Sequence, residues 1–475
     1  MDALVVLIPL LPFIAAALIG IGQLSGALRG AASESTTAII AMWTISMSCL
    51  LALVLLGADL LNKNTGQLNV GQWLSSDTLS IQVNFITTGF NVRLAALFSV
   101  LLVIVMHFSI NYMHRETGFH RFFFILSLFA SGMLLLVLSG NAVGTFFGWE
   151  IAGLCSYLLI AYAYQCPIAT INATRVFITN RIGDASFILG TALSYAWADS
   201  INWNDLNAVS AQLSRGEATG IALCFALAAF AKSAQLPFTL WLARAMEGPI
   251  PSSAVFYGAI MIHAGVYLVC VLQPVFEQAP FAMAVLAVVG GITTVYSFIV
   301  GLTQTDVKNS LVFATSGQLG LMFLACGLGF WQLASWHLCA HAVVRCYLFL
   351  TAPSLMHAGL GNPVKPLTPF IGRLRRAYVA SLQRFWLDPI TDWTLVRPLQ
   401  RLAHDLGYFD DHILDQIMRA PASAIRALSS RTQRQENRAG AQGRKLGHAA
   451  NQFEQLILRP RYLVLFVLIT LLIVF

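Results

Sequence analysis

Long apolar runs constrain this chain more than any other feature, because a helix needs about 20 apolar residues to cross a bilayer. Eleven such segments precede residue 357. They lie near residues 3–24, 37–61, 84–112, 121–139, 142–164, 171–197, 218–241, 254–273, 281–302, 308–328 and 331–355. A twelfth, Tyr462 to Phe475, is long enough only if it begins near Ile457. The pattern predicts an all-α polytopic membrane protein with about twelve transmembrane helices.

The composition supports this prediction. Only 10% of the residues are charged and 57% are hydrophobic, whereas globular proteins have about 25% charged residues. A soluble enzyme, a disordered scaffold and a disulfide-stapled secreted domain are therefore excluded. The eight cysteines lie mostly in apolar runs and form no C-x-x-C pair, so we interpret them as small buried hydrophobic side chains. The first apolar run lacks a basic leader and a clear cleavage site, and we expect it to be retained as a span.

Residues 357–456 have a different character, because charges return and no 18-residue apolar run occurs. Sixteen of the 28 Lys and Arg residues lie between Lys365 and Arg461, against eight acidic residues. The positive-inside rule places this stretch in the cytoplasm and both chain termini outside. Leu399, Leu402 and Leu406 follow Pro398 at helical spacing, which predicts an amphipathic helix with Pro398 in its first turn.

Ionisable side chains inside the predicted spans are the main functional signal. Placing each one in the bilayer interior costs about 2.5 kcal/mol of free energy or more unless it is paired or hydrated. These candidates are Glu150, Arg175, Arg181, Asp184, Lys232, His263, Lys308, His337, His341 and Arg345. Arg181 and Asp184 are three residues apart, so they lie on one helical face and are predicted to pair.

Lys232 is the most informative of these residues. Pro237 follows five residues later and must break or kink the helix, which frees backbone carbonyls for water or for the ammonium group. Burial disfavours a protonated amine and a nearby carboxylate favours it. Movement of Glu150 relative to Lys232 could therefore load or release a proton. The alternative is a static buried ion pair that fixes helix packing.

His337, His341 and Arg345 are spaced four residues apart, so they line one helical face over roughly 12 Å. The histidines can relay protons, whereas the arginine remains a fixed positive charge. No acidic or cysteine third ligand lies on that face, so we expect no metal site. His263 has two open interpretations, a packing residue or a further relay member.

Several segments resemble a known family in serial order. They are Gly148-Trp149-Glu150, residues 153–160, 175–184, 232–237 (Lys-Ser-Ala-Gln-Leu-Pro), 245–254, 264–268, 306–308, 316–320 and 341–350. Together they resemble the largest antiporter-like subunit of respiratory complex I, in the superfamily of Mrp-type cation/proton antiporters. Residues 387–398 also resemble the C-terminal region of that subunit.

This resemblance implies two inverted five-helix repeats, each with a broken helix, joined by a polar axis across the membrane. It makes Glu150 the glutamate that modulates Lys232 in the first half-channel, and Lys308 a second-repeat lysine near the join. It gives Arg175 and Asp184 the role of polar partners.

Three departures from the family pattern bear on function. Val255-Phe256-Tyr257-Gly258-Ala259 stands where the family usually has a histidine, and His263 lies elsewhere on the helix. Arg345 occupies the place of a lysine and cannot cycle its proton. After His357 the chain continues in polar sequence, which implies an incomplete second repeat. We therefore divide the chain into N-terminal transmembrane helices (1–112), an antiporter-like proton-translocating core (113–356), a basic amphipathic cytoplasmic segment (357–456) and a C-terminal transmembrane helix (457–475).

Three functions follow as hypotheses. The first is a proton-translocating subunit that couples the proton-motive force to an inorganic-carbon (CO2/bicarbonate) pump, with a large zinc-containing, carbonic-anhydrase-like peripheral partner. The second is a proton-pumping subunit of a complex I-like NADH:quinone oxidoreductase, and the third is a non-transporting structural subunit. Each implies other membrane subunits, protons and the lipid bilayer of the inner (plasma) membrane as partners, and no nucleic acid. No nucleotide-binding, flavin or cysteine-cluster motif is found, so we expect no cofactor and no catalytic site in this chain.

Overall fold

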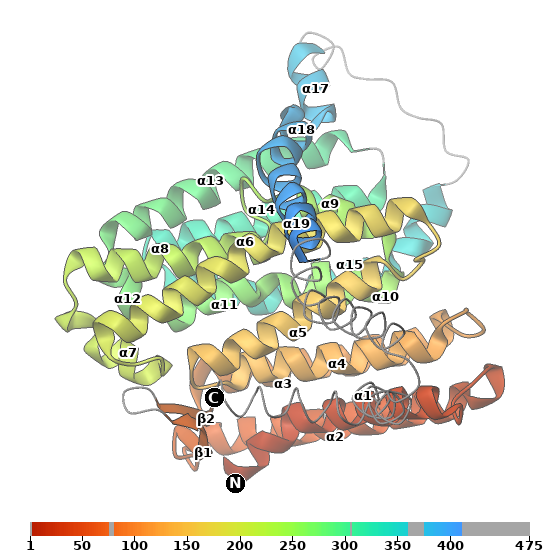
Figure 1. Ribbon diagram of the computed structural model, residues 1–475, viewed down its shortest axis with the longest axis horizontal. Helices are drawn as coiled ribbons and strands as arrows, with labels where there is room; N and C mark the ends of the chain where they lie inside the picture. Colours follow the sequence, from red (N-terminus) through yellow and green to blue (C-terminus); the bar gives the residue numbers. More distant parts are fainter. Residues whose placement is uncertain (1, 76–79, 305, 360–374, 411–475) are drawn as a thin grey trace, which may run out of the picture. The chain divides into compact units, whose positions relative to one another are not determined.

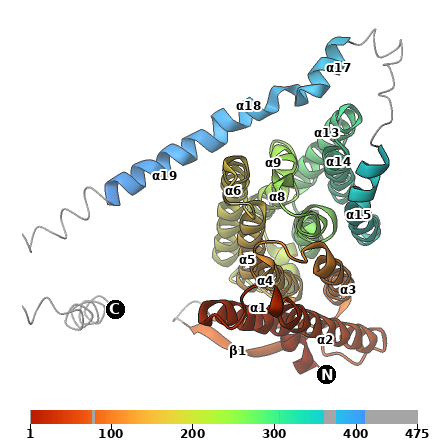
Figure 2. The same cartoon turned by 90° about the vertical axis from the view of Figure 1, so that its right-hand side faces the viewer.

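The computed structural model describes residues 2–75, 80–304, 306–359 and 375–410, which are mostly helical as predicted. Long helices lie side by side in Figure 1, and Figure 2 shows many of them nearly end-on. They are α1 (Leu7–Ser25), α2 (Glu34–Leu60), α3 (Gly89–Tyr112), α4 (Phe119–Leu138), α5 (Ala142–Ile160), α6 (Pro167–Ala198), α8 (Arg215–Lys232), α13 (Pro280–Thr303), α14 (Val307–Gly327) and α15 (Trp331–Gly359). Shorter elements between them are η1 (Asp2–Val6), η2 (Ala31–Ser33), α7 (Trp203–Val209), η3 (Ser210–Gln212), η4 (Ala245–Glu247) and α12 (Gln273–Glu277).

Within the described residues, nine helical segments are long and apolar enough to cross a membrane. Each of the eleven segments predicted before residue 357 contains helix. α6 and α8 are not among the nine, and both carry ionisable residues of the candidate site. The predicted twelfth span lies outside the described residues. The chain is a multi-pass membrane protein.

A β-hairpin precedes α3 and was not predicted. β1 (Gln67–Ser75) pairs antiparallel with β2 (Ser80–Ile86), from Gln67 opposite Ile86 to Ser75 opposite Ser80. The third predicted span began at residue 84, but α3 begins only at Gly89. Apolar and polar residues alternate along β2, and this period of two is the pattern of a strand. The hairpin is anchored where Asn141 Nδ2 donates to Asn84 Oδ1 at 2.5 Å.

The predicted span 218–241 is broken, and the break begins at Lys232. α8 ends at this residue, and α9 (Leu240–Arg244) starts after an irregular connection that contains Pro237. Ala234 has a left-handed backbone, with φ of 50°. Trp241 Nε1 donates to the carbonyl of Ala231 at 2.8 Å, which ties α9 to the end of α8. The sequence located the break at Pro237, whereas the helix ends five residues earlier.

The span from Ile250 to Val271 is also irregular, although its sequence predicts an ordinary helix. It consists of α10 (Ile250–Ser253), the π-helix η5 (Ala254–Ala259), the 3-10 helix η6 (Met261–His263) and α11 (Ala264–Val271). Nearly all of these residues are buried within the protein. Irregular backbone is tolerated at membrane depth where protein rather than lipid surrounds it.

α4 and α5 approach each other closely at Gly148, and this contact gives the first prediction. A Cβ atom at Gly148 would lie 2.5 Å from the backbone nitrogen of Leu136, a group that cannot move without shifting α4. We expect Gly148→Ala to destabilise the protein by about 1–3 kcal/mol, the usual cost of overpacking. The midpoint of thermal unfolding in nanodiscs measures it. Gly291→Ala is the matched control, because a Cβ there would meet nothing within 4 Å; equal midpoints for the two variants would contradict the prediction.

Short helices follow α15 and form the last described part of the chain. Residues 375–396 contain α17 (Arg375–Leu382), η7 (Arg384–Trp386), α18 (Leu387–Thr391) and η8 (Asp392–Val396). Ser381 Oγ donates to the carbonyl of Ile299 at 3.0 Å, which attaches α17 to α13. The predicted amphipathic helix is confirmed as α19 (Arg397–Phe409), with Pro398 in its first turn and Leu402 and Leu406 exposed.

Candidate functional site

Side chains from α5, α6 and α8 gather around Lys232. We name this group the lysine cluster: Trp149, Glu150, Arg181, Asp184 and Lys232. Arg181 Nη2 lies 2.5 Å from Glu150 Oε2, and its Nε lies 2.9 Å from Asp184 Oδ2. The predicted Arg181–Asp184 pair is therefore confirmed. Asp184 also accepts a 2.8 Å hydrogen bond from Trp149 Nε1, so its carboxylate is held from two sides.

Lys232 is buried in this cluster, with an exposed fraction of 2%. Its Nζ donates to the backbone carbonyl of Trp149 at 2.9 Å and lies 4.9 Å from the centroid of the Trp149 ring. Gly153 leaves room for the ammonium group, because a Cβ there would lie 3.3 Å from Nζ. The carboxyl end of α8 also favours a cation at this position.

The structure pairs Glu150 with Arg181, while Lys232 bonds to the carbonyl of Trp149. In the part of the chain that the structure describes, both carboxylates of the cluster form their ion pairs with Arg181. Lys232 instead has a carbonyl and an aromatic ring as its direct partners. Arg181 is thus the ion-pair partner of both acids, and a carboxylate that it releases becomes available to Lys232.

A second group joins η6, α14 and α15, and we name it the histidine cluster: His263, Gln318, His337, His341 and Arg345. His263 Nε2 and His341 Nδ1 are 2.8 Å apart, and Arg345 Nε donates to His341 Nε2 at 3.1 Å. His337 Nε2 lies 2.8 Å from Gln318 Oε1, and its ring centroid is 6.0 Å from that of His341. The predicted row on α15 is confirmed. His263 is bonded directly to this row and so belongs to the cluster, and its role as a relay stays a prediction. Gln318 was not predicted.

One hydrogen bond connects the surroundings of the two clusters. Ser233, next to Lys232, donates from Oγ to the carbonyl of Ile262, next to His263, at 2.7 Å. Nearby on the irregular segments, Gln235 Oε1, Ser253 Oγ and Tyr257 Oη are buried and have no hydrogen-bond partner among the described residues. A buried polar group without a hydrogen-bond partner lowers the stability of the fold by about 1–3 kcal/mol. The region between the clusters is therefore polar, although it lies inside the protein.

Lys308 and Arg175 lie apart from both clusters. Lys308 is half-buried in the first turn of α14, two residues after the N-cap residue Asp306, whose carboxylate accepts from Asn309 N at 3.0 Å. Arg175 Nη2 lies 3.2 Å from Asp392 Oδ2 of η8. The contacts of Arg175 thus join α6 to the segment after α15 rather than to Lys232.

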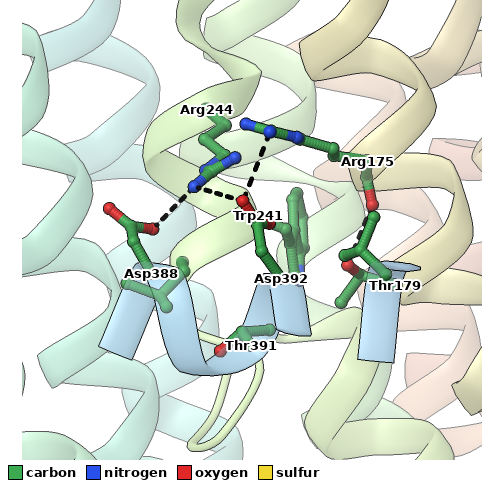
Figure 3. A pocket seen from close by; sticks show the side chains of 9 residues that line it. Arg175, Thr179, Trp241, Arg244, Asp388, Thr391 and Asp392 are labelled. Carbon is green, nitrogen blue, oxygen red and sulfur yellow. Dashed lines mark hydrogen bonds and ion pairs between the residues drawn. The ribbon is translucent and has the colours of Figure 1, made fainter. Parts of the chain in front are cut away.

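Arg175 is one of several charged residues that line a small pocket, shown in Figure 3. Arg244 Nη2 lies 3.3 Å from Asp388 Oδ1 and 3.5 Å from Asp392 Oδ2, and Trp241 forms part of the wall. We name Arg175, Arg244, Asp388 and Asp392 the charged pocket. The sequence did not single out the last three. Only the resemblance of residues 387–398 to the family pointed to this region.

The charged pocket gives the second prediction. Asp392→Asn removes both ion pairs of Asp392 but leaves Arg244 bound to Asp388. Ion pairs of limited burial contribute about 1 kcal/mol or less, so local opening of residues 384–396 should rise roughly fivefold. Limited trypsin cleavage at Arg384, which precedes Phe385, measures this opening.

Asp405→Asn on α19 is the control for this substitution, because the side chain of Asp405 is 78% exposed. We expect its cleavage rate to match that of the wild type. Unchanged cleavage of the Asp392→Asn protein would show that these ion pairs do not hold the segment in place.

Comparisons with known proteins place both clusters in one family region. Residues 139–368 match the family "NADH:quinone oxidoreductase/Mrp antiporter, TM", and residues 73–123 match "NADH-Ubiquinone oxidoreductase (complex I), chain 5 N-terminus". The chain is 35% identical over 357 residues to the chloroplastic NAD(P)H-quinone oxidoreductase subunit 5 of Zygnema circumcarinatum, covering 74% of this chain and 51% of that protein. It is 35% identical over 350 residues to the NADH-quinone oxidoreductase subunit L of Rhodobacter capsulatus, covering 69% and 48%.

A solved structure has a similar fold. The chain is similar to a chain of the Mrp complex from Dietzia sp. DQ12-45-1b, with a TM-score of 0.64 and 25% sequence identity. The match covers 75% of this chain and 39% of the other. This chain spans about half the length of the two curated relatives named above.

Proposed function

Because the chain belongs to the superfamily of Mrp-type antiporters and complex I antiporter-like subunits, we propose that it translocates protons as one subunit of a complex I-like membrane assembly. Residues 113–356 are its proton-translocating core, and the inner (plasma) membrane is its location. Redox chemistry, if the assembly performs any, is the task of partner subunits.

The observation that carries this proposal is the position of Lys232. A buried lysine without a direct carboxylate partner holds its proton weakly, and a carboxylate that approaches it strengthens the hold. Arg181 competes with Lys232 for Glu150 and Asp184. A shift of Arg181 would therefore change the proton affinity of Lys232 without any large helix movement.

The histidine cluster extends this site toward the second half of the core. Protons leaving Lys232 would travel past Ser233 and the buried polar groups at Gln235 and Tyr257 to His263 and His341. Water would bridge these groups, since buried polar atoms in a membrane interior need partners. Arg345 would stay charged and repel a proton on His341, which would favour its onward release.

Proton transport and partner identity can be tested in one preparation. We would purify the full chain through an affinity tag in a mild detergent, identify the proteins that accompany it, and reconstitute the intact assembly in liposomes with an internal pH dye. Proton flux coupled to the assembly's reaction supports the proposal. An intact assembly that turns over without moving protons would reject it and favour the non-transporting structural subunit.

The inorganic-carbon pump makes a different prediction for the partner. It requires a large zinc-containing, carbonic-anhydrase-like subunit in the purified assembly. The complex I-like proposal has the better support, because the curated relatives are subunits of quinone oxidoreductases. Co-purification of quinone oxidoreductase subunits would favour it, and co-purification of the zinc protein would favour the carbon pump.

A further inference from the structure

Two cysteines lie together at the ends of α11 and α14, the helix that follows His263 and the helix that carries Gln318. Cys270 is the penultimate residue of α11, and Cys326 is the penultimate residue of α14. Their Sγ atoms are 4.0 Å apart, although the residues are separated by 56 positions in the sequence. No sequence motif pairs them, and we had interpreted both as small buried hydrophobic side chains. A disulfide would require the two sulfurs to approach from this separation to the bonding distance of about 2.05 Å.

The surroundings of Cys270 suit thiol chemistry. Ser335 Oγ on α15 donates to Cys270 Sγ at 3.9 Å, and a hydroxyl donor stabilises negative charge on sulfur. Cys270 is partly exposed, whereas Cys326 is buried with 0% exposure. A small oxidant would therefore meet Cys270 first, and Cys326 is positioned to resolve the oxidised product.

The predicted topology puts this pair on the oxidising side of the membrane. The helical spans that contain Cys270 and Cys326 both start on the side of the basic loop residues Arg244 and Lys308, which the positive-inside rule assigns to the cytoplasm. Both spans therefore end on the outer side, where disulfides form and persist.

We propose that Cys270 and Cys326 form a reversible disulfide under peroxide. The Cys270 thiolate attacks a peroxide oxygen, the O–O bond breaks, and hydroxide leaves and takes up a proton, which yields a sulfenic acid and one water. The Cys326 thiolate then attacks this sulfur, the S–O bond breaks, and the second hydroxide leaves as water with the proton from Cys326. Overall, two thiols and one peroxide give one disulfide and two waters.

The disulfide would restrain the histidine cluster, and this consequence rests on the proposed function. His263 lies seven residues before Cys270, and Gln318 lies eight before Cys326, so each is about 10–12 Å along the chain axis from the bond. The bond would join α11, which begins directly after His263, to α14, whose Gln318 bonds to His337. Relative movement of these elements during transport would be slowed.

The test treats the intact assembly in native membranes with hydrogen peroxide, then maps peptides by mass spectrometry without reduction. We expect a peptide pair linked through Cys270 and Cys326 that dithiothreitol separates. It should persist in Cys339→Ser, a neighbouring cysteine on α15, and vanish in Cys326→Ser. The exposed Cys166 reports that peroxide has reacted with the protein. The proposal is overturned if Cys270 and Cys326 remain free thiols after Cys166 is oxidised, or if Cys270 links to Cys339 instead.

Proton flux forms a separate readout. Peroxide should lower flux roughly threefold or more in the wild type and leave Cys326→Ser unchanged, as expected when a conformational step limits the rate. A mapped disulfide with undiminished flux would overturn the restraint on the histidine cluster. If the assembly shows no proton flux before peroxide is added, the proposed function fails. The mapped disulfide between Cys270 and Cys326 would still establish the redox site.

Discussion

Replacing Lys232 by methionine is expected to lower proton flux roughly 100-fold or more, the range typical for loss of a proton-transferring side chain. Methionine has nearly the length of lysine but carries no proton, so it fills the space beside Trp149 and Gly153 without a charge. Flux in liposomes, normalised to the amount of assembled complex, measures the effect. Glu150→Gln should also abolish proton-coupled activity while the assembly stays intact, because Arg181 then keeps only Asp184 as a partner.

Lys232→Arg separates a switching proton site from a static positive charge. Arginine keeps its proton under all conditions in proteins, so the variant should assemble and yet be inactive. Lys63→Met in an exposed loop is the control and should behave as the wild type. Wild-type flux in Lys232→Met and Glu150→Gln would reject proton transport through this site, and loss of assembly in both would favour a static ion pair.

Replacing His341 is expected to have the second largest effect. His341 is buried, with 7% exposure, and bonds to both His263 and Arg345. His341→Phe leaves these two partners unsatisfied and removes the central group of the relay, so flux should fall roughly tenfold or more. The same liposome assay measures it.

A glutamine at position 341 distinguishes relay from packing. It can still donate and accept hydrogen bonds but does not titrate near neutral pH. We expect His341→Gln to assemble normally and to remain as inactive as His341→Phe. His120→Gln serves as the control, because His120 is also buried and hydrogen-bonded, to Thr37 at 2.7 Å, but lies outside both clusters. Normal flux in His341→Gln would mean that the residue only packs.

The parts of the site that were predicted correctly are those that one helix determines by itself. Arg181 and Asp184 are three residues apart, and His337, His341 and Arg345 follow at intervals of four, so a regular helix must place each set on one face. The pairing of Glu150 with Arg181 could not be predicted in this way, because the two residues lie on different helices. Glu150 and Lys232 are both functional candidates by sequence, but the position of Arg181 between helices decides which of them make contact.

The sequence by itself determined that this chain crosses a membrane repeatedly and which charged residues lie inside it, because the length of an apolar run and the cost of a buried charge are local properties. Only the tertiary structure decided that His263 bonds to His341, that Arg175 bonds to Asp392, and that Cys270 lies beside Cys326. These partners are far apart in the chain. They are brought together by helix packing, by the irregular backbone at Lys232 and in η5, and by the attachment of residues 375–396. No pattern of local spacing in the sequence contains that information.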